Sequence, residues 1–402
     1  MSDKTILVIN TGSSSIKMAL IDQASEQFIA EGMAQRLGEK DAVLSWSVSE
    51  TEYHDDIAYA DCHTAMQKML DALFSLLDKH SIVAVGHRVV HGGEKFFKPI
   101  VIDDGVMADI EQLSHLAPLH NPVNLIGIRA AMKHLQALPH IAVFDTAFHH
   151  SLPPHAYLYA VPYHWYEKYG VRRYGFHGTS HHYVAQQAAR LLGRELNDCK
   201  LITVHLGNGC SATAIKDGMS IDTSMGMTPL EGLVMGTRSG DVDPGLHQFI
   251  AKKSGASLDE VTDMLNRESG LLGLSGLSND MRTLLHAAEA GESRAVLAIE
   301  VFCYRLAKSI AALAVSLEYI DAIVFTGGIG EHASVIRAKV SKQLAILGLR
   351  LDVKRNNQHG KDTQGLISVD DADVSLWVIA TAEEKMIARY VAATLTDGER
   401  LT

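Results

Sequence analysis

The chain alternates between two kinds of hydrophobic pattern. Short runs of four or five consecutive apolar residues, rich in β-branched side chains, predict buried β-strands. Longer stretches with an apolar residue at every third or fourth position predict amphipathic helices packed on those strands. The predicted strands include residues 141–144, 323–325 and 375–379, and the predicted helices include residues 63–79, 292–319 and 382–395. This alternation is typical of an α/β fold.

Three of the apolar runs lead into glycine-rich turns, at residues 6–17, 202–211 and 323–331. Glycine lets the backbone approach closely and adopt a positive φ, so a glycine cluster after a strand can direct several N–H groups at one phosphate. A single cluster of this kind is more often an ordinary turn between strands. Three of them, spread along the chain, favour a site that binds the phosphates of a nucleotide.

The first two glycine turns have the same local plan, in which a strand, the turn, a second strand and a polar hairpin follow one another. This repetition indicates two related halves. A length of 402 residues suits two medium-sized domains, and the proline-containing stretch 149–154 is a candidate linker. We expect an N-terminal domain over residues 1–149 and a C-terminal domain over residues 150–381, with the last helical segment, residues 382–402, packed on the first.

Composition excludes several classes of protein. Apolar residues make up 47% of the chain and charged residues 21%, which leaves little room for disorder. We expect no membrane-spanning segment, because no apolar run approaches the roughly 18 residues that a bilayer requires. The net charge of −11 argues against a nucleic-acid partner. The four cysteines form no CxxC pair, so reduced thiols are expected, and nothing directs the chain out of the cytoplasm.

Polar and charged residues gather in glycine-containing motifs between the three turns. The motifs are residues 86–93, 117–121, 144–146, 174–181 and 235–241. Any one of them could be polar for solubility alone. Arg88 and Arg238 are the stronger candidates, because each follows an apolar stretch among small residues, where a guanidinium can bind carboxylate or phosphate through two hydrogen bonds.

Other catalytic patterns are weaker here. His177 and His181 would share a helix face as a metal pair, but the HExxH glutamate is missing and Gly178 places His177 on a loop. A hydrogen-bond donor is the better role for His177. No GxSxG nucleophile elbow and no GxxxxGK[ST] loop occurs, so serine hydrolysis and the P-loop mechanism are disfavoured. Hairpin turns on two facing domains are the remaining way to cradle phosphates.

Long stretches of this sequence resemble one known family, the acetate kinase family of acyl-phosphate-forming kinases, from Ile6 to Glu384. The matching motifs are residues 10–17, 86–93, 144–149, 173–181 and 228–241. The resemblance implies an α/β fold of two duplicated actin-like, ribonuclease H-like domains with a ligand cleft between them, which would close around the substrates. It also implies a homodimer that uses ATP and acetate.

Carried over residue by residue, the resemblance implies a role for each motif in the acyl site. Arg88 and Arg238 would hold the carboxylate and the transferring phosphoryl group, with Asp145 beside the acyl site as the family's catalytic acid. His177 would donate a hydrogen bond to the transition state. His120 and Val90 would contact the substrate, and valine at position 90 favours acetate, because propionate kinases of the family tend to have alanine there.

The resemblance also implies a nucleotide site and a metal site. Lys17 would face the phosphates, and Asn10 and Glu383 would be ligands of Mg²⁺, with Mn²⁺ as an alternative ion. The implied nucleotide-binding residues are His205, Leu206, Gly207, Asn208 and Gly209 at the phosphates, Asp280, Met281 and Arg282 near the adenosine, and Gly328, Ile329, Gly330, Glu331 and His332 on its other side. Ala382 and His332 depart from the family's usual asparagines, so we expect this chain to differ there.

The implied reaction is a reversible, direct in-line transfer of the ATP γ-phosphoryl group to acetate, giving acetyl phosphate and ADP. A carboxylate oxygen is already a nucleophile, so catalysis reduces to alignment and charge neutralisation. Three alternatives stay open: a propionate kinase of the same family, a non-catalytic ATP-binding switch of the actin or Hsc70 type, and a sugar kinase in which Asp145 would act as the base.

Overall fold

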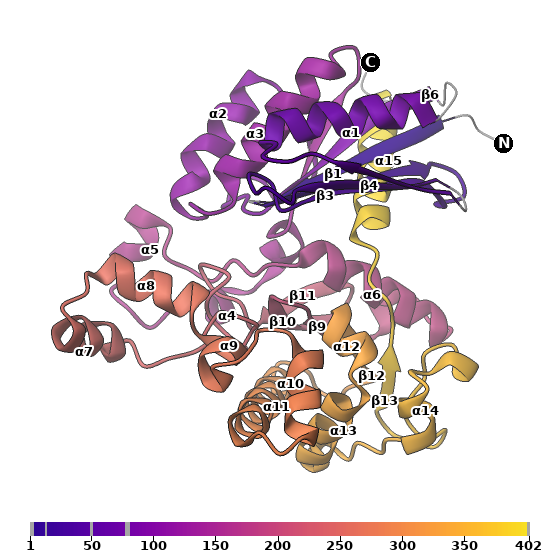
Figure 1. Ribbon diagram of the computed structural model, residues 1–402. Helices are drawn as coiled ribbons and strands as arrows, with labels where there is room; N and C mark the ends of the chain where they lie inside the picture. The colour runs from indigo at the N-terminus through magenta and orange to yellow at the C-terminus, as the bar shows by residue number, and fades with distance from the viewer. Residues whose placement is uncertain (1–3, 13, 49–50, 77–80, 400–402) are drawn as a thin grey trace. The chain divides into compact units, whose positions relative to one another are not determined.

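The computed structural model describes residues 4–12, 14–48, 51–76 and 81–399. Position 13 of the first glycine turn, the end of the predicted helix 63–79 and the last three residues of the segment 382–402 lie outside the described residues. The chain divides into two compact units, one formed by residues 1–147 with 382–402 and the other by residues 148–381 (Figure 1).

The first unit is built on an eight-stranded sheet with the order β5-β4-β3-β2-β1-β6-β8-β7. β2 and β3 continue from β1 as an antiparallel meander, whereas β6 is parallel to β1, and β8 is parallel to β6. The strands are β1 (Lys4–Thr11), β2 (Ser15–Asp22), β3 (Phe28–Gln35), β4 (Val43–Val48), β5 (Thr51–Asp56), β6 (Ser81–Val89), β7 (Ile100–Val101) and β8 (His140–Phe144).

Helices cover both faces of this sheet, which explains why β1 is apolar at consecutive positions (Figure 1). Leu7 and Ile9 pack with Met66 and other residues of α1 and α3 on one face. Ile6 and Val8 pack with the C-terminal helix α15 on the other. The α-helices of the first unit are α1 (Cys62–Leu76), α2 (Asp104–Gln112), α3 (Asn121–His134) and α15 (Glu383–Glu399), with the 3₁₀ turn η1 (Leu113–His115).

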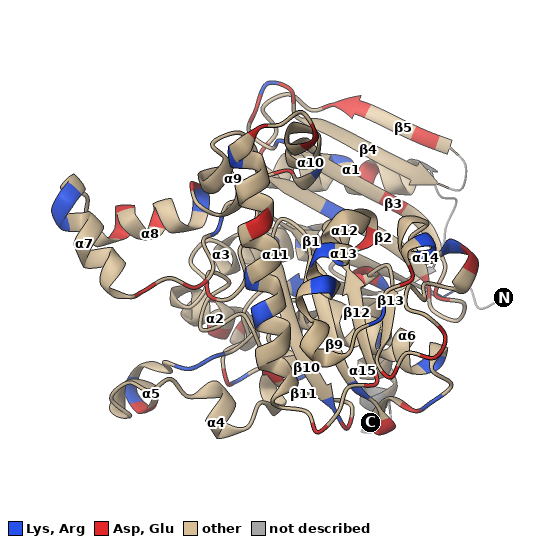
Figure 2. Ribbon diagram, turned by 90° about the horizontal axis from the view of Figure 1, so that it is seen from below, with Lys and Arg blue, Asp and Glu red and all other residues tan. Residues whose placement is uncertain are grey.

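The edge of the first sheet is protected by charge. β5 is exposed along its whole length, and Figure 2 shows acidic residues towards both of its ends. Charged side chains on an edge strand discourage pairing with another chain. In the same figure, basic and acidic residues are interspersed over the helices and strands of both units, and no described helix has the length and hydropathy needed to cross a membrane.

The second unit repeats the core of the first. Its five-stranded sheet has the order β11-β10-β9-β12-β13, with β10 and β11 antiparallel to their neighbours and β9, β12 and β13 parallel. The order β3-β2-β1-β6-β8 in the first unit has the same pattern of directions, which confirms the predicted duplicated α/β fold. The strands are β9 (Lys200–Leu206), β10 (Cys210–Lys216), β11 (Met219–Thr223), β12 (Ala322–Thr326) and β13 (Ser375–Val378).

Helix α6 packs on one face of this sheet, where Val184 and Ala188 meet Leu201 and Val324. The long helix α11 contacts β9 and β10 as well as α9, α10 and α13. The α-helices of the second unit are α4 (Pro154–Tyr157), α5 (His164–Tyr169), α6 (Gly178–Leu191), α7 (Gly245–Ser254), α8 (Leu258–Arg267), α9 (Gly270–Ser275), α10 (Met281–Glu289), α11 (Ser293–Ala314), α12 (Gly327–His332), α13 (Ser334–Gln343) and α14 (Val353–Asn357). The 3₁₀ turns are η2 (Ala147–Ser151), η3 (Leu196–Asp198), η4 (Ala345–Leu347) and η5 (Lys361–Thr363).

The third glycine turn opens the short helix α12, whereas each of the first two turns joins a pair of antiparallel strands. Gly327 has φ +74°, and a Cβ on it would lie 2.8 Å from the backbone oxygen of Leu206. Only glycine allows this approach of β12 to the end of β9. The second and third glycine turns are therefore neighbours at the same edge of the second sheet.

Candidate active site

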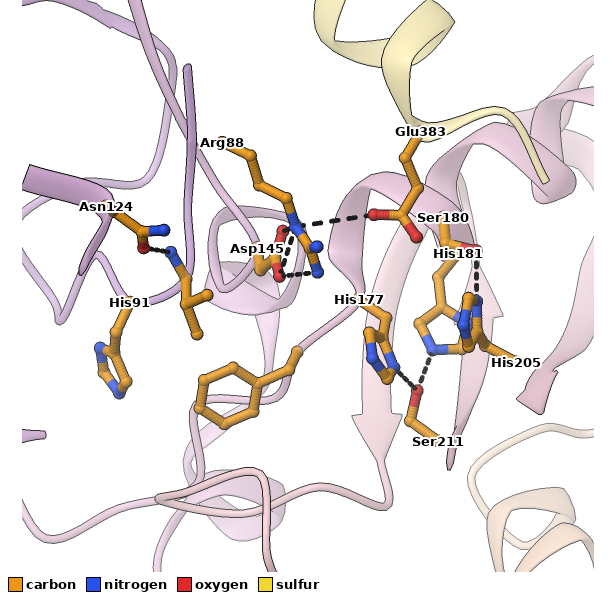
Figure 3. Close-up of polar contacts among 12 residues, drawn as sticks. Arg88, His91, Asn124, Asp145, His177, Ser180, His181, His205, Ser211 and Glu383 are labelled. Atoms are coloured by element: carbon orange, nitrogen blue, oxygen red, sulfur yellow. Dashed lines mark hydrogen bonds and ion pairs between the residues drawn. The ribbon is translucent and has the colours of Figure 1, made fainter. Parts of the chain in front are cut away.

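Arg88 and Asp145 meet at the C-terminal edge of the first sheet. Arg88 is the penultimate residue of β6, Asp145 directly follows β8, and these two strands are parallel neighbours. The Asp145 carboxylate accepts from Arg88 Nε at 2.9 Å and from Nη2 at 2.7 Å (Figure 3). A hydrogen bond from the Asp145 amide to the Val89 carbonyl, at 3.0 Å, holds the end of β8 against β6.

Burial and the neighbouring charges shift the pKa values of Arg88 and Asp145 in opposite directions. Burial raises the pKa of Asp145, and the Arg88 charge opposes that rise without cancelling it. Burial lowers the pKa of Arg88, but Asp145 and Glu383 outweigh it and the net shift is upward, so the guanidinium stays protonated. Glu383 Oε2 lies 3.6 Å from Arg88 Nε. Within the described residues Arg88 Nη1 has no hydrogen-bond partner, which leaves one edge of the guanidinium for an anion.

Two asparagines of α3 fix the loop that follows Arg88, and sequence reasoning did not single them out as functional. Asn124 accepts from the Val90 amide at 3.1 Å and donates to the Thr11 carbonyl at 2.8 Å. Asn121 accepts from the His91 amide and donates to the His91 carbonyl. The signal was available in the Asn-x-x-Asn spacing, which places both amides on one face of the helix. His120 directly precedes α3, and both it and Val90 are partly exposed.

The predicted metal and phosphate residues of the first unit lie on β1, β2 and the start of α15. Asn10 and Lys17 are register partners on β1 and β2. Lys17 Nζ is 2.8 Å from Glu384 Oε1. Burial lowers the pKa of Lys17, but Glu384 and, to a smaller extent, Glu31 and Glu383 together outweigh it, so the net shift is upward. The Lys17 ammonium group therefore pairs with the Glu384 carboxylate. The neighbouring acid, Glu383, faces Arg88 instead.

In the second unit, His177 and Arg238 converge on the second glycine turn. His177 directly precedes α6 in a left-handed conformation, φ 56° and ψ 27°, which is uncommon for a residue other than glycine. Its ring stacks on His205, with centroids 4.3 Å apart. A Cβ placed on Gly209 would lie 3.3 Å from His177 Nε2 and 3.5 Å from Arg238 Nη1. Glycine at position 209 keeps this space open.

Arg238 is a partly buried cation with no carboxylate partner among the described residues. Burial lowers its pKa, and within the described part of the chain its guanidinium makes a single long hydrogen bond, 3.5 Å to the Pro229 carbonyl. Its loop is tied to the glycine turn by a bond from the Gly236 amide to the Asn208 carbonyl at 3.0 Å. A partly desolvated charge without a counter-charge is stabilised by an anionic partner, so this position is suited to a bound anion.

The metal-pair alternative for His177 and His181 finds no support in the geometry. Both rings face the same hydroxyl, that of Ser211, at 2.9 Å and 2.7 Å. Among the described residues no group of three or more histidine, cysteine or acidic side chains could hold a metal ion. His177 is therefore placed as a hydrogen-bonding group, next to the helix rather than within it.

A cavity of about 500 Å³ lies within the second unit. Eight of its lining residues are among those predicted for the nucleotide: Gly207, Asn208, Asp280, Met281, Arg282, Gly328, Ile329 and His332. Sequence reasoning missed three others, Asn279, Leu285 and Ala333. Leu285 lies one helical turn after Met281, a spacing that could have identified it. Five predicted residues are not on the lining: His205, Leu206, Gly209, Gly330 and Glu331.

Two of the predicted nucleotide residues stabilise helices that border this cavity, Asp280 from its lining and Glu331 from outside it. Asp280 caps α10, accepting from the amides of Arg282 and Thr283, and a side-chain bond from Arg282 lowers its pKa to about 2. Glu331 accepts from the Gly327 and Thr381 amides at 3.0 Å and 3.3 Å and so closes α12 on itself.

Comparison with known proteins agrees with this arrangement. Residues 5–389 match the family model described as the Acetokinase family. The chain is 51% identical to an acetate kinase of Ectopseudomonas mendocina over 98% of its own length and 100% of the relative's. Among solved structures, a propionate kinase from Francisella tularensis has a TM-score of 0.92 at 43% identity, covering 96% of this chain and 98% of that one. Acetate kinase from Porphyromonas gingivalis has a TM-score of 0.89 at 40% identity, covering 98% and 99%.

The repeated sheet topology, the glycine turns and these matches define an ATP-dependent phosphotransferase with two actin-like units. The chain belongs to the Acetokinase family.

Proposed function

We propose that this chain is the kinase that transfers the γ-phosphoryl group of ATP to acetate, reversibly and without a covalent enzyme intermediate. A carboxylate oxygen of acetate attacks the γ-phosphorus, the new O–P bond forms, and the bond to the β,γ-bridging oxygen breaks with its electron pair leaving on ADP. The observation that carries the proposal is the partly buried Arg238, without a carboxylate partner among the described residues, beside His177 over the second glycine turn.

Two arginines supply the positive charge that acts on the reacting groups in this proposal. Arg88, through its Nη1 edge, binds the acetate carboxylate, while Arg238 neutralises charge on the phosphoryl oxygens in the transition state and His177 donates a hydrogen bond to them. The attacking oxygen carries no proton at neutral pH, so no base is needed. Asp145, which the resemblance named as a catalytic acid, acts in this proposal by holding Arg88.

The cavity of the second unit receives the nucleoside. Met281, Leu285 and Ile329 offer apolar contacts for a base, and Asn208 and Asn279 supply amide groups. His332 borders this cavity, where the family usually has asparagine. We therefore expect the His332 side chain to influence which nucleotide this chain prefers. Lys17 faces the nucleotide phosphates in this proposal. Its ion pair with Glu384 partly neutralises the ammonium charge that acts on them.

Asn10 and Glu383 suit a magnesium ion, with Mn²⁺ as an alternative. Both offer oxygen donors, which a hard divalent cation prefers. When bound, the ion neutralises charge on the nucleotide phosphates.

Acetate is the preferred substrate in this proposal. Val90 lies two residues after Arg88 and narrows the space for an extra methylene of the substrate. A pocket discriminates between substrates that differ by one methylene by only about 1–3 kcal/mol. Propionate should therefore react less efficiently rather than not at all. Specificity constants for acetate and propionate measure this preference.

We propose, in addition, a cytoplasmic homodimer. ATP is a cytoplasmic metabolite, and α5 with its flank exposes three aromatic side chains, Tyr163, Trp165 and Tyr169, at 60%, 42% and 63%. Such a cluster is typical of a surface that a second chain covers. Sedimentation at several concentrations tests the oligomeric state.

The activity is tested by acetyl phosphate formation from magnesium ATP and acetate, with Arg88→Ala and Arg238→Ala as variants. Each should lower turnover by about 100-fold or more. Arg129→Ala is the control, because Arg129 forms only a surface pair with Glu111. Unchanged turnover in both active-site variants would overturn the assignment. Nucleotide binding without acetate turnover would favour an actin-like switch, and phosphorylation of a sugar hydroxyl would favour a sugar kinase.

A further inference from the structure

The hydroxyl of Ser211 lies between two histidine rings in the core of the second unit. Its oxygen is 2.9 Å from His177 Nδ1 and 2.7 Å from His181 Nε2 (Figure 3). Ser211 belongs to β10, His181 to α6, and His177 directly precedes that helix. Ser211 and His181 are completely buried.

A serine hydroxyl has one hydrogen to donate, although its oxygen can accept from other donors. Ser211 can therefore donate to only one of the two rings, and it must accept from the other. If His181 presents Nε2–H, the serine hydrogen goes to His177 Nδ1. The two rings are in this way coupled, and the tautomer of one determines that of the other.

The far side of His181 completes the chain of hydrogen bonds. Its Nδ1 lies 2.7 Å from Thr203 Oγ1 on β9, which is also completely buried. Burial lowers the pKa of His181 well below its ordinary value, so this ring is neutral, with one nitrogen donating and the other accepting. A buried donor or acceptor left unsatisfied is costly, so the chain Thr203, His181, Ser211, His177 runs in one direction or the other as a whole.

We propose that Ser211 is a positioning residue that holds His177 in its Nε2–H tautomer. In that direction Thr203 donates to His181 Nδ1, His181 Nε2–H donates to Ser211, and Ser211 donates to His177 Nδ1. His177 then has its remaining hydrogen on Nε2, the ring nitrogen that borders the space over Gly209. This inference rests on the proposed function, in which His177 faces phosphoryl oxygens.

The charges around that space favour this direction when an anion is bound. A neutral His177 with its proton on Nδ1 would direct a lone pair at anionic oxygens. A doubly protonated His177 would place a second cation beside the partly buried Arg238 guanidinium, whose pKa is already lowered by desolvation. The neutral Nε2–H form donates a hydrogen bond without adding charge.

The kinetic test uses Ser211→Ala, His177→Ala and the double variant. Ser211→Ala should lower kcat by about 10-fold to 100-fold with KM for ATP and acetate unchanged. It should have no further effect in the His177→Ala background. The matched control is Thr213→Val, which removes another buried hydroxyl of β10, one that bonds Thr223 instead of a histidine. An equal loss of kcat from Ser211→Ala with and without His177 would overturn the inference.

A second readout needs no turnover. Nitrogen-15 NMR of histidine-labelled protein, saturated with a non-hydrolysable ATP analogue, should show His177 as the Nε2–H tautomer in the wild type and as a mixture in Ser211→Ala. An unchanged tautomer in the variant would overturn the inference even if kcat falls. A wild-type protein that makes no acetyl phosphate would overturn the proposed function instead, and the NMR comparison would still decide the role of Ser211.

Discussion

The carboxylate of Asp145 binds one edge of the Arg88 guanidinium at 2.9 Å and 2.7 Å, 57 residues away along the chain. Two-point contact fixes the plane of the guanidinium as well as its distance. The opposite edge is thereby oriented, and in our proposal acetate binds there.

Replacing Asp145 with asparagine should raise KM for acetate about 10-fold or more, with KM for ATP little changed. Asparagine keeps the shape but loses the charge, so Arg88 is held less firmly and turns towards Glu383. Steady-state kinetics with each substrate varied in turn measures this split. Asp109→Asn, which disturbs only the surface pair with Lys95, is the control, and an unchanged KM for acetate in Asp145→Asn would contradict the orienting role.

Gly209→Ala should lower kcat by about 10-fold or more while the protein stays folded. The added methyl would lie 3.3 Å from His177 Nε2, so the His177 ring must shift slightly, and at 3.5 Å from Arg238 Nη1 it would fill the space beside the guanidinium. Gly328→Ala is the comparison, because a Cβ there meets no atom within 4 Å and lies in the cavity wall; its effect should fall on KM for ATP. Equal effects on kcat from both variants would contradict the assignment of Gly209 to the transfer site.

Stability should fall as the pH drops below about 6.5. Burial lowers the pKa of His149 to about 4 in the folded protein. In the unfolded chain a histidine takes up its proton near pH 6.5, so the unfolded state gains protons first and stability is lost progressively between pH 6.5 and 4. His149 alone should contribute about 1 kcal/mol of this loss between pH 7.5 and pH 5.5.

Urea unfolding at these two pH values measures the loss. His149→Gln should retain a hydrogen bond to the Phe176 carbonyl, which accepts from His149 at 2.9 Å, and should reduce the pH dependence by that amount. A pH dependence identical to that of the wild type would show that His149 is not buried in its neutral form.

Arg337→Met should destabilise the second unit by about 3 kcal/mol or more and raise KM for ATP. Arg337 is completely buried, and burial lowers its pKa to about 10. It donates to the Gly330 and Glu331 carbonyls at 2.7 Å and 2.9 Å and to both oxygens of Asn356. Without the Arg337 guanidinium, these buried oxygens lose their hydrogen-bond donor, and α12 loses the side chain that holds it beside the cavity. Thermal unfolding with Arg350→Met as the exposed control tests this; equal melting temperatures for the two variants would contradict it.

The duplicated fold could be predicted from local sequence because it rests on local patterns. β1 with β2 and β9 with β10 are hairpins, in which apolar runs and the turn residues between them are neighbours along the chain. Where the outcome depended on a distant segment, local patterns were not sufficient. The third glycine turn begins a helix because Gly327 packs against the backbone of Leu206, about 120 residues earlier, and no local pattern encodes that contact.

In the candidate site, too, some features follow from local sequence and others depend on contacts between distant segments. Arg88, His177 and Arg238 were identifiable as side chains able to bind anions, and the sequence by itself determined these chemical groups, the glycine turns and the family. Tertiary structure decided which group has a partner: Asp145 compensates Arg88, Arg238 has no carboxylate among the described residues, and Ser211 couples His177 to a buried ring. The physical reason is that charge compensation and tautomer depend on distances of about 3 Å between residues far apart in sequence, and only the register of parallel strands and the packing of α6 on its sheet set those distances.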